Sequence, residues 1–308
     1  MNWHAGELAM QRRAGVSRVR PRAGMFHASL PDPARAFLAT QTLVAVAWLD
    51  ADEPVAGLIA GPPGFAADLN GAEVHIALGP TPDPALVAAL EGRSAPFGLL
   101  GIEPATRRRM RVNGRARVEE GRRGRRLAIS TDEVFSNCPK YIQARAPESS
   151  PESFPSPARG APRAELSEDD RARLRRADTI FTASGNAALG LDASHRGGEP
   201  GFLKLAAGVD GELLELLELP DYSGNLMFQT LGNILEDGRL SILVPDFQRG
   251  DAIELRARAE IRDEVDPARH PGAQRLVILR PTRIQTISGL LTGPWTPPES
   301  SPANPRLA

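Results

Sequence analysis

The sequence passes through the same order of predicted elements twice, and this repetition is what most constrains its fold. In each half a helix-like stretch comes first, followed by a series of short strands, a second helix and long strands that mix hydrophobic residues with arginine. Both halves also share a turn with Pro-Gly-Phe, at 62–65 and at 199–202. A repeated order predicts two copies of one small unit. Short strands, frequent turn signals and few helices favour an antiparallel barrel over a doubly wound parallel sheet.

The hydrophobic pattern and the turn residues predict helices and strands in each half. Ser167 is expected to cap the helix at 167–176, with Asp170 completing an approximate capping box. The predicted helices are 33–40, 84–91, 167–176 and 225–235. The predicted strands are 43–49, 55–60, 73–78, 97–102, 107–119 and 125–130 in the first half, and 179–184, 187–191, 201–206, 212–219, 240–244, 252–262 and 275–286 in the second.

Proline, serine and charged residues mark the boundary between the halves. The run from Pro147 to Pro162 has the composition of a linker or an exposed crossover. The start, 1–22, is polar and arginine-rich without a following apolar stretch, which favours a surface extension over a transit peptide. The expected parts are an N-terminal extension (1–29), a first unit (30–146), a linker (147–164), a second unit (165–292) and a C-terminal tail (293–308).

Bulk composition limits the classes of protein that fit. The chain has 308 residues, enough for two domains, with 41% hydrophobic and 24% charged residues. A formal net charge of −1 predicts neither nucleic-acid nor membrane partners. The single cysteine, Cys138, excludes an intramolecular disulfide, which agrees with a cytoplasmic location. No apolar run is long enough to span a bilayer as a helix.

Several familiar catalytic motifs do not occur in the sequence. There is no Gly-x-x-x-x-Gly-Lys-Ser/Thr loop and no Gly-x-Gly-x-x-Gly after a strand, which disfavours an ATPase or a Rossmann enzyme. Ser194, His195 and Asp192 are close in sequence, but neighbours on a strand face opposite sides, and no Gly-x-Ser-x-Gly elbow exists. A hydrolase triad is therefore disfavoured. The five histidines are dispersed, so no zinc site is predicted.

Arginine recurs at alternate positions of one predicted strand. Arg107, Arg109 and Arg111 would share a face of this strand. An exposed basic face is the simpler interpretation, and an anion-binding face is the alternative. The basic run 121–126 is most simply a hairpin turn, and it lacks the interleaved aromatic residues that nucleic-acid binding would favour.

Three segments carry the residues best suited to a ligand. Two polar turns, at 192–202 and 220–225, contain glycines that let backbone N–H groups approach a ligand. Arg196 can fork onto phosphate oxygens, so these turns suit a ligand with a phosphate and a flat ring. The third segment, 137–143, reads Asn-Cys-Pro-Lys-Tyr-Ile-Gln. For Cys138 a buried filler is the favoured interpretation. For Lys140, Tyr141 and Gln143, structural and site roles are equally supported.

Together, the segments 137–143, 192–205 and 222–246 resemble the pyridoxamine 5′-phosphate oxidase-like family of FMN-binding split barrels. More narrowly they resemble its two-barrel bacterial members, the flavin-nucleotide-binding proteins, over 30–145 and 165–290. This resemblance implies a mainly β fold with short helices, built from tandem split β-barrels with Greek-key features. It also implies FMN at a barrel–barrel interface, here as a pseudo-dimer within one chain.

The resemblance assigns expected roles to particular residues. Phosphate would be held by residues of the second barrel, the flavin ring would lie along its backbone, and residues of the first barrel would close the site. Many family members have a basic residue where this chain has Asn225. The catalytic candidates are Lys140, Gln143 and His195. The expected cofactor-binding residues are Ser194, His195, Arg196, Gly197, Phe202, Tyr222, Ser223, Asn225, Lys140, Tyr141 and Gln143.

One cofactor site is expected, because the matching place in the first half, 79–83, lacks a basic residue. The end of the chain, 290–308, lacks the family's pyridoxal-phosphate-binding pattern, so another small-molecule substrate is favoured. The leading hypothesis is an FMN-dependent oxidoreductase, as a monomeric pseudo-dimer or a homodimer. The alternatives are a non-catalytic flavin-nucleotide storage or sensing protein, and a split barrel that binds haem or a deazaflavin.

Overall fold

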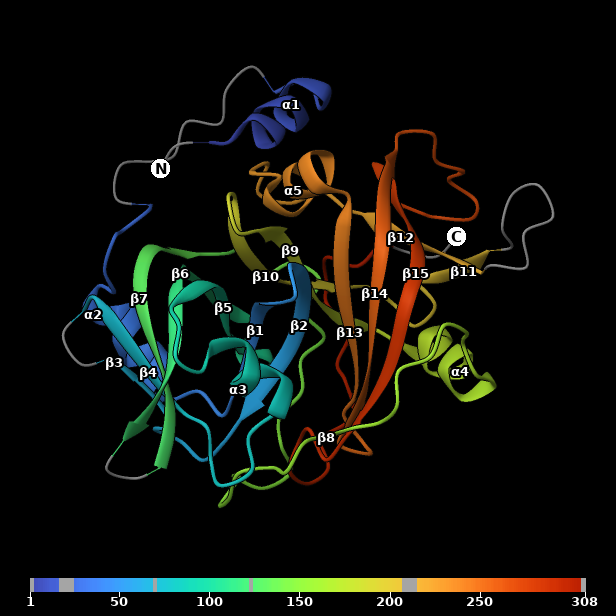
Figure 1. Cartoon of the computed structure of the whole chain (residues 1–308). Helices are drawn as coiled ribbons and strands as arrows, with labels where there is room; N and C mark the ends of the chain where they lie inside the picture. Colours follow the sequence, from blue (N-terminus) through green and yellow to red (C-terminus); the bar gives the residue numbers. More distant parts are fainter. Residues whose placement is uncertain (1–2, 17–24, 69–70, 122–123, 207–214, 306–308) are drawn as a thin grey trace.

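The computed structural model describes residues 3–16, 25–68, 71–121, 124–206 and 215–305 and contains two antiparallel sheets that lie side by side (Figure 1). The first sheet has the order β2-β1-β5-β6-β7-β4-β3, and the second has β10-β9-β13-β14-β15-β12-β11, with β8 paired to β15. The predicted mainly β class is confirmed. Each hydrogen-bonded path ends in an edge strand rather than closing, so the barrels are split.

The bounds of the elements divide into two units. The first unit contains α2 (Asp32–Ala39), β1 (Leu43–Asp50), β2 (Glu53–Ala60), β3 (Ala66–Asp68), β4 (Glu73–Ala77), α3 (Pro84–Leu90), β5 (Ala95–Glu103), the 3-10 turn η1 (Pro104–Thr106), β6 (Arg108–Gly121) and β7 (Gly124–Ser136). The second contains α4 (Glu168–Arg176), β9 (Thr179–Asn186), β10 (Gly190–Gly197), β11 (Lys204–Ala206), β12 (Leu216–Asp221), α5 (Gln229–Asp237), β13 (Arg239–Asp246), β14 (Asp251–Arg262) and β15 (Arg275–Ser288). Outside the two units are α1 (Ala5–Arg13), in the N-terminal extension, and β8 (Ala158–Arg159), in the linker.

The two sheets correspond strand by strand. The pairing of β6 with β7 shifts register at Asn113/Gly114, and the pairing of β14 with β15 shifts at Arg256/Ala257, so β7 and β15 each carry a bulge at the equivalent place. The Pro-Gly-Phe turns also correspond, because Gly64 and Gly201 have φ of 85° and 84°. A residue other than glycine would be strained at these angles. The order of elements that recurs along the chain thus gives the same spatial order of strands in both sheets.

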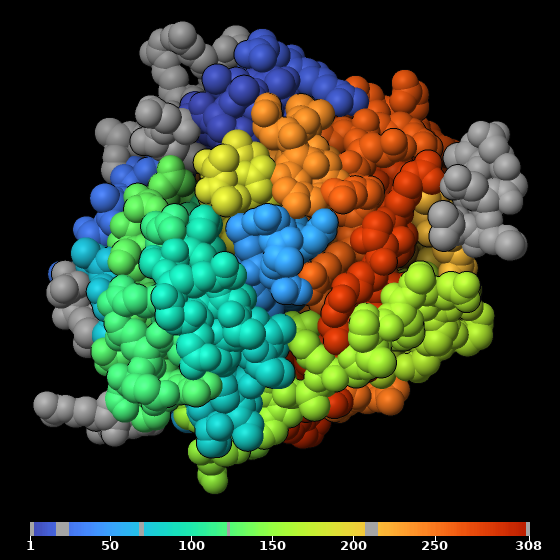
Figure 2. Space-filling view, in the orientation of Figure 1, coloured from blue at the N-terminus to red at the C-terminus, as the bar shows by residue number. Residues whose placement is uncertain are grey.

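A shared apolar layer joins the two units. Strands β1, β2 and β5 pack against β9, β10 and β13. Strand β1 is buried on both faces: Val44, Val46 and Trp48 enter the core of their own unit, whereas Ala45 and Ala47 enter the shared layer. Alanine side chains are small, so the sheets can approach closely. In Figure 2 the light-blue β1–β2 hairpin lies directly against the orange strands of the second unit.

Two of the predicted helices illustrate how local chemistry sets the start of an element. Ser167 caps α4, and Asp170 completes the capping box as predicted. The predicted start of a helix at Asn225 is wrong, because α5 begins at Gln229. The side chain of Asn225 accepts the N–H of Met227 at 3.1 Å, and Leu226 has φ of 63°. A left-handed residue interrupts a helix, so 222–228 form an irregular loop instead.

Some strand bounds also differ from the predictions. The Ser-His-Arg sequence lies inside β10, which extends to Gly197, rather than after a strand that ends at Leu191. The strand predicted at 201–206 is confined to β11. Residues 212–214 of the strand predicted at 212–219 lie outside the described part, and 216–219 belong to β12, which continues to Asp221. Residues 122–123 of the predicted basic turn also lie outside it. No helix among the described residues is long and apolar enough to cross a membrane.

Candidate functional site

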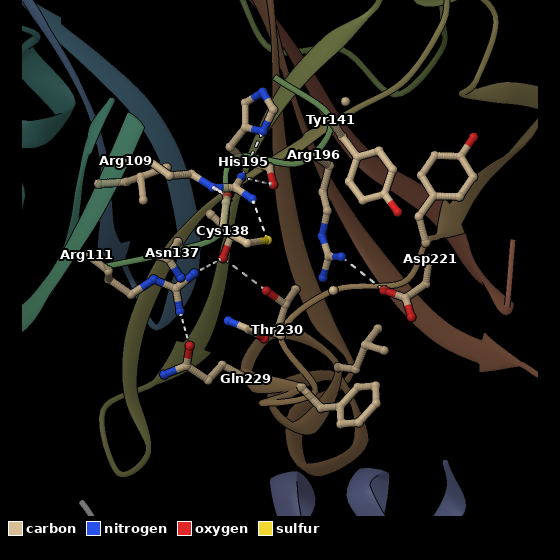
Figure 3. A pocket seen from close by; sticks show the side chains of 18 of the residues that line it. Arg109, Arg111, Asn137, Cys138, Tyr141, His195, Arg196, Asp221, Gln229 and Thr230 are labelled. Carbon is tan, nitrogen blue, oxygen red and sulfur yellow. Dashed lines mark hydrogen bonds and ion pairs between the residues drawn. The ribbon is translucent and has the colours of Figure 1, made fainter. Parts of the chain in front are cut away.

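A hollow opens to solvent at the seam between the two units (Figure 3). It encloses a cavity of about 110 Å³. The first unit contributes β5, β6 and the segment 137–141 to its wall, and the second contributes β10, the end of β12, the loop 222–228 and the start of α5. The hollow therefore exists only because the two units meet.

Arg111 links the two units at the back of the hollow. Its side chain is buried, and its Nη1 donates to Asp192 Oδ1 at 3.0 Å and to Gln229 Oε1 at 2.6 Å. Its Nη2 donates to Ser194 Oγ. Its Nε is buried without a hydrogen-bond partner among the described residues. Burial lowers the pKa of Arg111, but arginine keeps its proton at any pH at which proteins work.

Arg109, two residues earlier on the same face of β6, binds mostly neutral groups. Its Nε donates to the carbonyl oxygen of Cys138 at 2.9 Å, and its Nη1 lies 3.0 Å from His195 Nδ1. Its Nη2 lies 3.7 Å from the Cys138 sulfur. Within the described residues, no carboxylate is at ion-pair distance from Arg109. Its positive charge is therefore available to a ligand.

His195 is a buried, neutral imidazole. Burial, followed by the charges of Arg109, Arg145 and Arg196, lowers the pKa of His195 well below its usual value. Because Arg109 can only donate, Nδ1 of His195 is the acceptor and Nε2 carries the hydrogen. The His195 imidazole is hydrogen-bonded to Arg109 and not to the hydroxyl of Ser194, which lies 3.1 Å from the hydroxyl of Thr230. The two neighbours therefore do not form a nucleophile–base pair.

Arg196 stands at the more open side of the hollow. Its Nη1 donates to Asp221 Oδ1 at 2.9 Å, and Arg275 donates to the other oxygen of Asp221 at 2.7 Å. The side chain of Arg196 is 28% exposed, so it can gain a further partner from solvent. Arg275 keeps Asp221 neutralised when Arg196 turns toward a ligand.

The start of α5 points at the hollow without a side-chain cap. Phe228 is the N-cap residue in a left-handed conformation, and no side chain accepts the first free N–H groups. Gln229, Thr230 and Leu231 line the hollow. Free N–H groups at a helix start attract anions. Three wall residues, Tyr141, Leu226 and Phe228, have positive φ, which is typical of backbone held in a strained form at a functional site.

The rings of two tyrosines form one wall of the hollow. The rings of Tyr141 and Tyr222 lie 5.1 Å apart at 37°, and the Tyr141 hydroxyl donates to the carbonyl oxygen of Ser223 at 2.9 Å. Burial raises the pKa of Tyr222 to about 12, so this phenol stays protonated. Leu226 and Phe228 extend the wall. The hollow thus combines a cationic side with an aromatic and apolar one.

Most, but not all, of the residues predicted for a site lie at this hollow. Ser194, His195, Arg196, Gly197, Tyr141, Tyr222 and Asn225 line it. Phe202 packs instead in the core of the second unit, in the same cluster as Leu174 of α4. Gln143 is 2% exposed and binds the chain around Asn304, so its amide has no free donor. Lys140 and Ser223 do not line the hollow, and the Lys140 ammonium reaches the Ser223 carbonyl oxygen at 3.4 Å.

Several residues of the hollow were not among those predicted. The sequence predicts that Arg109 and Arg111 share one face of a strand and favours an exposed basic face, whereas both line the hollow. Cys138 was expected to be a buried filler, yet it is only half-buried and lines the hollow. Asp221 belongs to the predicted 220–225 turn but has no assigned role there. Gln229 and Thr230 are not predicted at all, since nothing in their local sequence distinguishes them from ordinary polar residues.

No family model matches the sequence, and no curated protein does. Solved structures do match it. HupZ of Group A Streptococcus is 16% identical, with 40% of this chain and 99% of that chain covered and a TM-score of 0.30. A putative pyridoxamine 5′-phosphate oxidase from Lactobacillus delbrueckii is 14% identical (40% and 94% covered, TM-score 0.30). An F420 reductase is 18% identical (39% and 98% covered, TM-score 0.27).

Proposed function

We propose that the hollow binds FMN and that the chain is an FMN-binding oxidoreductase of the pyridoxamine 5′-phosphate oxidase-like family, acting on a small molecule. The observation that carries this proposal is the convergence of Arg109, Arg111 and Arg196 with the uncapped start of α5 on one solvent-open hollow. Asp192 pairs with Arg111, and Asp221 pairs with Arg196 and Arg275, which leaves Arg109 without a carboxylate partner among the described residues. A ligand with a dianionic phosphate suits such a site.

The residues present fit a phosphorylated flavin. Asn225 stands where many family members have a basic residue, and Arg109 and Arg111 supply the positive charge from the other unit instead. Two buried polar atoms on the wall lack partners among the described residues, Arg111 Nε and Asn137 Oδ1. Each is a hydrogen-bonding group that a bound ligand would satisfy. The tyrosine pair provides a flat surface for a ring system.

The chain's own residues would bind and orient the cofactor, and bound FMN would supply the redox chemistry. Arg196 and the start of α5 would hold the phosphate. Neutral His195, fixed by Arg109, would offer an uncharged edge to the ligand. Tyr141, Tyr222 and the residues beside them would keep water from the ring.

A flavin-binding protein without its own turnover is the second candidate, and one observation favours it. The pKa of His195 lies well below its usual value and that of Tyr222 is about 12, so neither exchanges a proton near neutral pH. Chemistry that needs a general acid from these groups would be slow. A haem ligand is less well supported, because His195 is buried and already bound by Arg109.

Visible absorption of the purified chain tests the proposal. We expect a flavin spectrum, with FMN identified by the mass of the compound released on heating. A colourless protein that takes up no added FMN would overturn it. Anaerobic mixing with NADH or NADPH then separates the two candidates, because bleaching of the flavin supports an oxidoreductase and a persistent yellow colour supports a binding protein.

A further inference from the structure

The seam has a second position equivalent to the hollow. Residues paired across neighbouring strands form one row in each unit. In the second unit the row runs from β10 to β14 through His195, Phe181, Leu243 and Glu254. In the first unit the matching row runs from β2 to β6 through Leu58, Ala45, Leu100 and Arg111. The hollow takes Arg111 from one row and His195 from the other. The equivalent place, here called the second seam, lies between Glu254 and Leu58.

The second seam has lost the features that would attract a charged ligand. Leu58 and Ile59 occupy the positions of His195 and Arg196, and Glu254 occupies that of Arg111. The cavity left beside Leu58 and Ile59 is about 20 Å³, against about 110 Å³ in the hollow. Side chains of the protein itself therefore fill the second seam.

A carboxylate stands at the start of the helix that corresponds to α5. Asp83 is the N-cap residue of α3, and its side chain accepts the N–H of Ala85 at 2.9 Å. Phe228 has the same place before α5 and offers no cap. The anion that α5 lacks is thus built into the second seam as the side chain of Asp83.

The linker supplies the matching cation. Arg159, on β8, binds both oxygens of Asp83, with Nε at 2.9 Å from Oδ1 and Nη2 at 2.8 Å from Oδ2. Its Nη1 donates to Glu254 Oε2 at 3.0 Å. The side chain of Arg159 is 8% exposed and that of Glu254 is 1% exposed. A bidentate arginine–carboxylate pair of this kind resembles the recognition of a bound anion.

The linker also supplies an aromatic ring. Phe154 packs against the bare backbone of Gly79, where an added Cβ would lie 2.6 Å from the Phe154 side chain. It also meets the ring of Phe65 edge to face at 6.4 Å. Strand pairing places Tyr222 of the hollow at the position of Gly79. Phe154 thus fills space next to the second seam that corresponds to the tyrosine side of the hollow.

We propose that the second seam is a latent site for a small aromatic anion, which the chain occupies in cis with the Asp83 carboxylate, held by Arg159, and with the Phe154 ring, packed on Gly79. The linker then does more than connect the units, because it closes one of two equivalent sites and leaves one ligand site per chain. This inference goes beyond the proposed function and does not depend on the identity of the ligand in the hollow.

Chemical rescue tests the latent site. The double variant Asp83→Ala/Phe154→Ala removes the carboxylate and the ring but keeps Arg159. Benzoate carries both missing groups, so millimolar benzoate should raise the Tm of the double variant more than that of the wild type, with an apparent affinity at least about tenfold higher, because a ligand stabilises the state that binds it. Benzamide, which has the ring without the charge, should have a much smaller effect.

The control is Ser167→Ala/Phe26→Ala, which removes a helix cap and an aromatic ring elsewhere. Equal benzoate shifts in the double variant, the control and the wild type would overturn the proposal, since benzoate would then act at the hollow or nonspecifically. If the double variant does not fold, Phe154→Ala alone retains the ion pairs. Toluene should then raise the Tm of Phe154→Ala more than that of the wild type, and identical responses would overturn the proposal.

Discussion

At the scale of single residues, Arg196 is the guanidinium group of the hollow best placed to respond to a ligand. Arg111 is buried and bound to Asp192, Gln229 and Ser194, so its removal would leave the buried Asp192 carboxylate without its ion-pair partner. Arg196 is partly exposed, and Arg275 also neutralises its partner Asp221. Removal of Arg196 therefore leaves no unpaired buried charge, and its effect on binding can be measured without loss of the fold.

Arg196→Ala should weaken FMN binding by about 1.5–3 kcal/mol, the usual contribution of a hydrogen bond to a charged group. Riboflavin has the same ring without the phosphate, so its affinity should be nearly unchanged. Fluorescence titration of both flavins measures the difference. Arg258→Ala, which removes an exposed arginine of β14, is the matched control. Equal losses for FMN and riboflavin would remove Arg196 from the phosphate site.

Sequence patterns identify some of these residues but not others. Ser194, His195 and Arg196 belong to a distinctive local string, so they could be predicted. Arg109 and Arg111 alternate along a strand in the same way as residues of an exposed basic face would. The second unit covers that side of β6, which buries Arg111 and partly buries Arg109. Contacts between segments 80 or more residues apart leave no local signal in a single sequence.

At the scale of elements, α1 packs against α5, the helix whose start faces the hollow. The two helices touch at their glycines, where a Cβ on Gly6 would lie 2.2 Å from the carbonyl oxygen of Gly232 (Figure 1). Glu7 is thereby buried, and burial raises its pKa to about 8 from 4.5. His4, Glu133, Asp192 and Arg111 also face it. The prediction of α5 missed its start because two left-handed residues, Leu226 and Phe228, leave no clear mark in the sequence.

The buried Glu7 predicts a pH dependence of stability. Its pKa is higher in the folded than in the unfolded chain, so the folded state binds more protons between pH 4.5 and about 8, and the free energy of unfolding falls as pH rises through this window. Glu7→Gln should remove this decline, because glutamine stays neutral, and the variant should be more stable than the wild type by several kcal/mol at the upper end of the window. Thermal unfolding of both proteins at the lower and upper ends of this pH window tests the prediction. A constant difference in Tm between the two proteins across this range would contradict the assignment.

At the scale of the whole molecule, the two units are held together by close backbone contact as well as by apolar burial. Gly98 of β5 faces β10, and a Cβ there would lie 2.7 Å from the backbone nitrogen of Ala193. Backbone cannot move aside as a flexible side chain can. The repeated order of elements allowed two units and a pseudo-dimer to be predicted, but the strands that meet are set by small residues such as Ala45, Gly98 and Ala193.

Gly98→Ala should destabilise the chain by about 1–3 kcal/mol, the usual cost of overpacking. The hollow depends on the same seam, so this variant should also weaken FMN binding. Gly160→Ala is the control, because its Cβ would meet its nearest neighbour at 3.6 Å, an ordinary contact. Denaturant unfolding and flavin titration provide the two measurements. A Gly98→Ala protein as stable as the control would contradict the close approach of the sheets.

The most direct test of FMN binding in the seam is the stoichiometry of an FMN titration monitored by flavin absorbance. We predict saturation at one FMN per chain, with binding strongly weakened in Arg109→Ala, because its charge has no carboxylate partner in the described part of the protein. Two FMN per chain, or full binding in the absence of the Arg109 guanidinium, would contradict a single flavin site in the hollow.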